Sequence, residues 1–339
     1  MQTIITLSPS GQTFSCEQEE TILESAIRQG FSFAYGCQRG NCAICKGKLL
    51  SGTIDYEDPD MKGLEKIAGD EILYCSAIPQ TDIEIESTEV FSKELPMPEV
   101  SPCKVVGKKM LADDVIHLQL KLPDAINIRF HAGQYLDILL PDASRRSFSI
   151  ASAPHDNEFI ELHIRHIPDG EYTDFIKNKL KINDLLRIEI PLGTFFLRED
   201  SQRPLIFIGG GTGFAPLKAM LEHAFYKKMQ NPIHLFWGVR AKQDLYLNDL
   251  PLLWEKQYSN FKFFPVLSEP LASDNWEGNI GYVHKTVLEH FPDMSEVDVY
   301  ISGPPVMIDA AKIAFIDQGL SESRMFSDAF EYNAHPDAN

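Results

Sequence analysis

The pattern of hydrophobic and polar positions changes twice along the chain. After Arg203, short apolar runs such as LIFIG, IHLFWG and VDVYIS alternate with longer segments such as APLKAMLEHAFYKKM and VMIDAAKIAFIDQG. Short apolar runs are typical of strands buried on both faces, whereas the longer segments have helical spacing. The alternation therefore predicts an α/β domain with a parallel sheet over residues 203–332.

Residues 103–200 have a different pattern, which is typical of antiparallel strands. The apolar or alternating runs are VIHLQLKLP, YLDILLP, RSFSIAS, FIELHIRHI and LLRIEIPLG, and turn residues separate them. Short strands at this spacing predict an antiparallel barrel or sandwich. Before them, FSKELPMPEVSP has three prolines and no periodicity, so residues 93–102 are expected to form an extended linker.

Residues 1–92 precede this linker and contain one clear helix pattern. In EETILESAIRQG, Thr21 is expected as the N-cap, and Glu24 completes a capping box three residues later. Apolar side chains then recur on one face of the helix. The chain of 339 residues is thus long enough for the several domains that its pattern indicates.

Composition and charge exclude several classes of protein. Twenty-one Gly, 21 Pro and 44% hydrophobic residues are near globular averages, which excludes collagen, coiled coils and wholesale disorder. No apolar run reaches the about eighteen residues that a membrane span needs. The first residues lack the pattern of a signal peptide, so a cytoplasmic location is expected. A formal net charge of -18 has the wrong sign for a nucleic-acid binder.

The negative charge is concentrated at one end of the chain. Residues 1–95 hold sixteen acidic and seven basic side chains, which gives a local net charge of -9. Such a surface is either an ordinary solvated face or a docking face for a basic partner protein.

Four of the six cysteines form the most specific motif in the chain. Cys37, Cys42, Cys45 and Cys75 follow the spacing C-x4-C-x2-C with a fourth cysteine after twenty-nine intervening residues. This is the plant-type 2Fe-2S spacing, and thiolates are soft ligands that suit iron. Disulfides and a structural zinc site are the alternatives. Three cysteines within nine residues are poorly spaced for separate disulfide bridges, and structural zinc sites usually have two CxxC-type pairs of ligands. The four cysteines are therefore predicted to hold a 2Fe-2S cluster.

Two segments of the middle part indicate a flavin site. Arg146, Phe148 and Ser149 lie in a strand-like run that follows AGQY, which ends at Tyr135. Gly170 and Thr173 open a helix, where a glycine turn and a threonine cap leave amides that suit a pyrophosphate. A planar cation such as Arg146 would clamp the same phosphates, with Phe148 against the flavin ring and Ser149 at its edge. The alternative is an ordinary strand with one exposed arginine.

Two loops of the last part indicate a dinucleotide site. The strand LIFIG leads into a glycine-rich loop and a helix, and the residues predicted to bind there are Gly210, Gly211, Thr212, Gly213 and Pro216. Gly303 and Pro304 follow the strand VDVYIS and precede another helix. Both loops are expected at the carboxyl ends of parallel strands, where α/β sheets bind ligands. The loop is not a G-x-G-x-x-G motif, because Phe214 occupies the last position.

Taken together and in this order, the motifs resemble those of the ferredoxin-NADP reductase superfamily, in its arrangement with an N-terminal plant-type ferredoxin. The resemblance implies a β-grasp 2Fe-2S domain over residues 1–92, a linker over 93–102, an antiparallel FAD barrel over 103–200 and an NAD(P)-binding α/β domain over 203–332. It implies that Phe148, Ser149, Ser302 and Phe330 contact the reacting rings. Arg240 would contact the 2'-phosphate if NADPH were the nucleotide, although this arrangement favours NADH.

The chain departs from the family pattern at two positions. Phe148 stands where the flavin motif usually has tyrosine, and Ser302 stands where the GPP motif usually begins with cysteine. An aromatic ring remains at the first position, whereas a smaller and more polar oxygen replaces the thiol at the second. An iron–sulfur redox sensor without turnover is a further hypothesis that these changes suggest.

The resemblance also implies an electron relay from NAD(P)H through FAD and the 2Fe-2S cluster to a partner protein. Segments such as GGGTGFAPLKAMLEH and AGQYLDILL are similar to those of bacterial reductases that serve a pyridoxamine-dependent (PMP-dependent) dehydrase in 3,6-dideoxysugar synthesis. The alternative partner is the oxygenase component of a mono- or dioxygenase, whose reductases have the same parts. No acid–base dyad is expected, and a monomer is the default.

Overall fold

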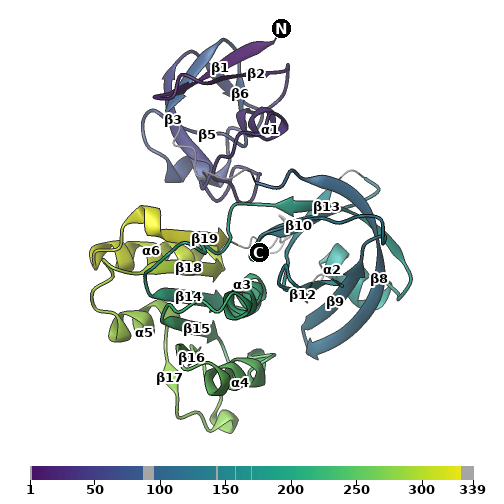
Figure 1. Cartoon of the computed structure of the whole chain (residues 1–339), viewed down its shortest axis with the longest axis vertical. Coiled ribbons are helices and arrows are strands. Elements are labelled where there is room, and N and C mark those ends of the chain that lie inside the picture. Colours follow the sequence, from purple (N-terminus) through teal and green to yellow (C-terminus); the bar gives the residue numbers. More distant parts are fainter. Residues whose placement is uncertain (1, 87–94, 143, 157, 169, 330–339) are drawn as a thin grey trace. The chain divides into compact units, whose positions relative to one another are not determined.

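The structure is a computed structural model that describes residues 2–86, 95–142, 144–156, 158–168 and 170–329. It divides into two compact units, Met1–Met97 and Pro98–Asn339, which are described separately. Figure 1 shows a small mixed sheet in the first unit and two larger sheets in the second. No helix among the residues described is long and apolar enough to cross a membrane.

The first unit is a five-stranded sheet packed on one helix. Its strand order is β2-β1-β7-β3-β5, with β1 parallel to β7 and the other pairs antiparallel. The bounds are β1 Thr3–Ser8, β2 Thr13–Cys16, β3 Lys46–Ser51, β5 Glu71–Leu73 and β7 Ile83–Glu86, with a separate pair of β4 Ile54–Tyr56 and β6 Ala77–Pro79 and a 3-10 turn η1 Lys62–Lys66. This is the β-grasp arrangement that the sequence analysis predicts.

Helix α1, Ile22–Arg28, begins as its sequence predicts. The Thr21 hydroxyl accepts a hydrogen bond from the Glu24 amide at 3.2 Å, and the Glu24 carboxylate accepts one from the Thr21 amide at 2.9 Å. Ile22 and Leu23 are fully buried under the sheet. The Leu23 amide also donates to the Tyr74 carbonyl at 2.8 Å, so the helix is tied to the segment that contains Cys75.

The second unit begins with an antiparallel barrel. Its strand order is β11-β10-β13-β8-β9-β12, and a bridge between Ile150 and Leu162 joins the two outer strands. The bounds are β8 Glu99–Ala112, β9 Val115–Lys121, β10 Tyr135–Leu139, β11 Arg145–Ser149, β12 Ile160–Arg165 and β13 Leu185–Leu192, with helix α2 Glu171–Asn178 after β12.

One boundary differs from the sequence prediction. Residues 99–102 were expected in the linker, but they already belong to β8, where Pro102 lies opposite Arg187 of β13. The prolines hide this strand in the sequence pattern, although Ser101 and Cys103 alternate inward as buried strand residues do.

The last part of the chain is a six-stranded parallel sheet, as predicted. Its order is β17-β16-β15-β14-β18-β19, and every residue of the central strand β14 is buried. The strands are β14 Leu205–Gly210, β15 Ile233–Val239, β16 Phe261–Leu267, β17 Asn279–Ile280, β18 Asp298–Gly303 and β19 Met325–Ala329. The helices are α3 Phe214–Tyr226, α4 Asp249–Gln257, α5 Val283–His290 and α6 Pro305–Asp317, with short 3-10 turns η2 Gly211–Gly213, η3 Lys242–Asp244, η4 Ala272–Asp274 and η5 Glu322–Arg324.

The cap of α1 provides a stability prediction. Thr21→Ala removes the hydroxyl that accepts from the Glu24 amide, which should lower the local free energy of unfolding by about 1 kcal/mol. Amides of α1 should then exchange with solvent roughly five-fold faster in native-state hydrogen exchange. Thr13→Ala, at an exposed position of β2, is the matched control. Equal acceleration of α1 exchange in both variants would contradict the role of the cap.

Candidate functional site

The four predicted cysteine ligands converge in the first unit. The loop between α1 and β3 contains Cys37, Cys42 and Cys45, and Cys75 follows β5. The Tyr74 amide donates to the Cys45 carbonyl at 3.1 Å, which brings the fourth cysteine to the loop. Thiol contacts pair Cys37 with Cys42 and Cys45 with Cys75, and electrostatic interactions join Cys42 to Cys45 and Cys37 to Cys75.

Backbone amides in this loop point at sulfur. The amides of Arg39 and Cys42 each donate to Sγ of Cys37 at 3.4 Å. The turn that directs them requires left-handed backbone, with φ of 54° at Gln38, 71° at Gly40 and 58° at Ala43. The positive φ at Gly40 favours glycine, and a Cβ there would also lie 2.0 Å from Sδ of Met61, which would have to move.

The electrostatics of the loop favour thiolate at Cys37. Hydrogen bonds from the Cys42 thiol and from the Arg39 and Cys42 amides lower the pKa of Cys37 to about 5. Thiolate is the form that binds metal, and amide hydrogen bonds to sulfur are the usual means of tuning a cluster. Four convergent thiols with inward amides therefore fit a 2Fe-2S cluster.

The remaining cysteines lie apart from this group. The buried Cys16 thiol donates to the Glu20 carbonyl at 3.2 Å, and burial raises the pKa of Cys103, in β8, to about 12. All six thiols are free, so the disulfide alternative is not found.

The predicted flavin residues lie on neighbouring elements of the barrel. Tyr135 of β10 pairs with Ser149 of β11. Arg146 and Phe148 are half-buried at alternate positions of β11, and the Phe148 ring lies 6.3 Å from the ring of Tyr172 in the first turn of α2. The Tyr172 hydroxyl is buried and has no hydrogen-bond partner among the described residues. A buried orphan hydroxyl beside these side chains fits a polar ligand such as FAD.

The predicted role of Thr173 as a helix cap is wrong. The N-cap of α2 is Gly170, and Thr173 is the third residue of the helix. Its hydroxyl lies within hydrogen-bond distance of the Gly170 carbonyl at 3.1 Å and accepts from the Ile167 amide at 3.1 Å. Thr173 therefore stabilises the turn before the helix, and the first-turn amides of α2 are left for another acceptor.

The two predicted dinucleotide loops touch each other at the ends of β14 and β18, which are parallel neighbours. A Cβ at Gly213 would lie 2.0 Å from the Ser302 carbonyl oxygen, and one at Gly210 would lie 2.9 Å from Cδ of Pro304. Gly211 has φ of 55° and Thr212 is buried. Pro216 lies in the first turn of α3, and Gly303 ends β18. This tight, glycine-lined junction fits the close approach of a dinucleotide.

Asp328 of β19 joins the flavin strand to these loops. Its carboxylate accepts from the Ser149 hydroxyl at 3.1 Å, and its carbonyl accepts from the Ser302 hydroxyl at 3.3 Å. No local pattern in the sequence indicates Asp328, because its partner Ser149 is 179 residues away. Phe330 itself lies outside the described residues.

Arg240 lies at the carboxyl end of β15, the edge that also carries the glycine loop. It is exposed, and its carbonyl accepts from the Glu269 amide at 2.9 Å. The neighbouring Lys242 is held by Asp274, whose carboxylate accepts from the Lys242 amide at 3.2 Å. Arg240 is thus the better placed of the two basic residues for a ligand at this edge.

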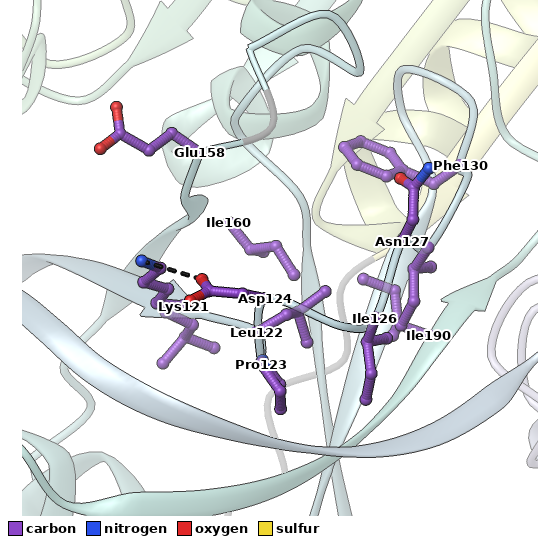
Figure 2. Close-up of a pocket in the computed structure, with 12 residues that line it drawn as sticks. Lys121, Leu122, Pro123, Asp124, Ile126, Asn127, Phe130, Glu158, Ile160 and Ile190 are labelled. Atoms are coloured by element: carbon purple, nitrogen blue, oxygen red, sulfur yellow. Dashed lines mark ion pairs between the residues drawn. The ribbon is translucent and has the colours of Figure 1, made fainter.

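A separate pocket of about 480 Å³ opens at one end of the barrel (Figure 2). Its lining includes Ile126, Phe130 and Ile160, and an ion pair of 3.2 Å joins Lys121 to Asp124 at its rim. None of the predicted site residues belongs to this lining.

Comparison with protein families assigns three domains. Residues 5–80 match the 2Fe-2S iron–sulfur cluster binding domain, residues 102–197 the oxidoreductase FAD-binding domain, and residues 207–312 the oxidoreductase NAD-binding domain. The cofactors are therefore a 2Fe-2S cluster, FAD and NAD(H).

Several proteins are similar to this chain over nearly their whole length. The CDP-6-deoxy-L-threo-D-glycero-4-hexulose-3-dehydrase reductase of Yersinia pestis is 39% identical, over 96% of this chain and 98% of that protein. The reductase component 1 of terephthalate 1,2-dioxygenase from Comamonas is 32% identical, over 96% of each chain. Among solved structures, the Amycolatopsis cytochrome P450 reductase GcoB matches with a TM-score of 0.82 and 29% identity, over 97% of this chain and 98% of that one.

These relatives are reductases, and the three domain matches cover most of this chain in the order cluster, FAD and NAD. The chain belongs to the family of NAD(P)H-dependent iron–sulfur flavoprotein oxidoreductases, in which a plant-type 2Fe-2S domain precedes the FAD- and NAD-binding domains of a ferredoxin reductase.

Proposed function

We propose that this oxidoreductase delivers electrons from NADH to a PMP-dependent dehydrase that acts on a CDP-linked 6-deoxyhexulose. This is the activity of a CDP-6-deoxy-delta-3,4-glucoseen reductase. The observation that carries the proposal is the 39% identity to the Yersinia dehydrase reductase, against 32% for the oxygenase reductases, at equal coverage of this chain.

The domain division that supports this relay is residues 1–92 for the cluster, 93–102 for the linker, 103–200 for FAD and 203–332 for the nucleotide. Each chain holds the complete set of cofactor domains, so the electron path needs no second copy and a monomer suffices. Six free thiols suit a reducing compartment, which supports a cytoplasmic location.

The cofactor residues have separate tasks. Cys37, Cys42, Cys45 and Cys75 are the cluster ligands. Arg146 and the first-turn amides of α2 hold the pyrophosphate of FAD, and Tyr135 and Phe148 lie along the flavin. Bound FAD supplies the conversion of a two-electron hydride into the single electrons that a 2Fe-2S cluster carries.

The nicotinamide is held where the two glycine-lined loops meet. Gly210, Gly211, Thr212, Gly213 and Pro216 let the dinucleotide approach the backbone, and Gly303 and Pro304 lie beside them at the same edge of the sheet. The hydroxyls of Ser302 and Ser149 both donate to Asp328, so this residue links the flavin strand to the strand that leads into the second loop. By the family resemblance, Phe330 is assigned to contact with the reacting rings. Arg240 is assigned to the choice between NADH and NADPH.

A reductase for an oxygenase is the second candidate function. The 0.82 TM-score to a cytochrome P450 reductase and the 32% identity to dioxygenase reductases favour it. In both cases the acidic first domain, with a net charge of -9 over residues 1–95, is suited to a partner with a basic docking face.

Reconstitution separates these two functions. Purified protein is mixed with NADH and either the PMP-dependent dehydrase with its CDP-hexulose or an oxygenase component, and the reduced products are measured. Turnover with the dehydrase alone supports the proposal. Turnover with the oxygenase alone would contradict the proposal and support the second function.

The cluster ligands can be tested independently of the partner. Cys42→Ser should abolish the visible absorbance of the cluster but retain at least half of the NADH-dependent reduction of ferricyanide, because the flavin and nucleotide residues lie in other domains. Cys103→Ser, a buried thiol of the barrel, is the control and should retain the cluster. A cluster that survives Cys42→Ser would exclude Cys42 as a ligand.

The serine of the flavin strand should affect hydride transfer. Ser149→Ala removes one hydrogen bond at the flavin edge, which at about 1.5 kcal/mol corresponds to a roughly ten-fold slower flavin reduction in stopped-flow measurements. Ser147→Ala, whose hydroxyl donates to Asp137 and not to Asp328, should change the rate less than two-fold. Identical rates of flavin reduction in Ser149→Ala and in the unmodified protein would show that Ser149 takes no part in hydride transfer.

A further inference from the structure

A buried ammonium group links the barrel to the first helix of the parallel-sheet domain. Lys218, on α3, is only 9% exposed. Its Nζ donates to the Ala151 carbonyl at 3.2 Å and to the Glu161 carboxylate of β12 at 3.3 Å, both in the barrel. It also donates to Glu222, one turn further along α3, at 2.9 Å. The lysine therefore spans the boundary between the two domains.

A second polar contact crosses the same boundary. Nδ1 of His163, on β12, shares a hydrogen bond of 3.1 Å with the hydroxyl of Tyr246, and the rings meet edge to face at 5.4 Å. His163 lies opposite His117 of β9, whose Nε2 is 3.4 Å from Glu161. The two contacts are therefore parts of one buried network.

The network includes three potential metal ligands, since donor atoms of His117, Glu161 and His163 all lie within 4.8 Å of one another. Two observations argue against a metal site. The Lys218 ammonium already lies beside the Glu161 carboxylate, and Tyr246 occupies Nδ1 of His163. A divalent cation would face the lysine at close range, so the ammonium is the cation for which these groups are arranged.

The barrel contacts of Lys218 lie close to the flavin motif. Ala151 is two residues after Ser149, and its amide donates to the Glu161 carbonyl at 2.7 Å. The Glu161 amide in turn donates to the Ser152 hydroxyl at 3.1 Å. Lys218 therefore bonds to both segments at the place where the chain after β11 pairs with β12.

The other end of the network leads to the glycine loop. Helix α3 starts directly after Gly213, so Lys218 is in the second turn of the helix that this loop opens. Tyr246 packs edge to face on Trp237 at 5.1 Å, and Trp237 donates its indole N–H to the Gly211 carbonyl at 2.9 Å. Both contacts thus connect the flavin strand to the nucleotide loop.

The charges in the network suit a geometric role. A hydrogen bond from His117 and the nearby Lys218 lower the pKa of Glu161 to about 2, whereas burial lowers the pKa of His163 to about 3, so at neutral pH the carboxylate is charged and His163 is neutral. Burial raises the pKa of Glu222. Buried ion pairs add little net stability, but they are sensitive to the position of each partner.

We propose that Lys218 and His163 are positioning residues for hydride transfer, which hold the nucleotide loop at a fixed distance from the flavin strand. This inference rests on the flavin and nicotinamide sites proposed above. It predicts that loss of the network slows the transfer itself without weakening nucleotide binding, because neither residue belongs to the loops that hold the dinucleotide.

The test uses the full-length protein with its cofactors and stopped-flow reduction by NADH. Lys218→Met keeps most of the side-chain stem but removes the ammonium, and it should lower the limiting rate of flavin reduction at least ten-fold with the Kd for NADH within two-fold. Lys227→Met is the matched control, since this lysine forms an exposed ion pair with Glu199 at the end of α3. An unchanged limiting rate, or a change in Kd alone, would overturn the proposal.

A second variant separates positioning from damage to the fold. Lys218→Met leaves the Glu161 carboxylate buried without its ammonium partner, so adding Glu161→Gln should restore much of the lost thermal stability but leave the limiting rate low. Tyr246→Phe removes only the hydroxyl that bonds to His163, and it should slow the limiting rate at least three-fold. Recovery of the limiting rate in the double variant would show that an unpaired buried charge, and not lost positioning, had slowed the transfer, which contradicts the proposal.

Hydrogen exchange in the absence of nucleotide tests the same link without any hydride transfer. In Lys218→Met, the amides of Ala151 and Glu161 should exchange at least five-fold faster, whereas Lys227→Met should leave them unchanged. If the amides of Ala151 and Glu161 exchanged at an unchanged rate in Lys218→Met, the proposed link between Lys218 and the barrel would be wrong. Failure of NADH to reduce the unmodified protein would instead disprove the proposed nucleotide site, so the two failures are distinguishable.

Discussion

The space between the loops that follow β14 and β18 admits no side chain, and the arrangement of the nucleotide site depends on this. Gly213 lies so close to the Ser302 carbonyl that any Cβ would collide with it. Ser302 of β18 lies opposite Asp328 of β19 in the parallel sheet, and Asp328 bonds both to it and to Ser149 of the barrel. The close contact of the loops and the pairing of β18 with β19 together align groups from both domains of the second unit. In the cysteine loop, the positive φ at Gly40 likewise favours glycine.

Much of the architecture could be predicted from the sequence because its determinants are local. The spacing of Cys37, Cys42 and Cys45 fits a single loop, and the capping box of Thr21 and Glu24 is complete within four residues. The three-part division follows from periodicity, which reports burial segment by segment. The start of β8 was missed for the same reason, because its prolines resemble a linker until pairing with β13 is known.

The parts that could not be predicted depend on contacts between distant segments. Ser149 and Asp328 are 179 residues apart, and Lys218 lies 57 residues from Glu161. No periodicity indicates such pairs, and His163 or Lys218 would pass for ordinary polar positions in a strand or helix. The prediction of a helix cap at Thr173 is wrong for a local reason. A threonine hydroxyl can bond either to an amide of the helix or to groups of the preceding turn, and the sequence does not distinguish these two arrangements.

The cysteine loop is unevenly exposed, and this affects how a bound partner changes the redox centre. Cys45 and Cys75 are buried, whereas Cys37 and Cys42 are only partly covered. Water can therefore solvate the charge of a reduced cluster mainly from the side of Cys37 and Cys42. A protein that docked over this side would displace that water and would thereby alter the reduction potential and the reorganisation energy of a cluster held there. Docking would then change the driving force for the electron as well as the distance that it crosses.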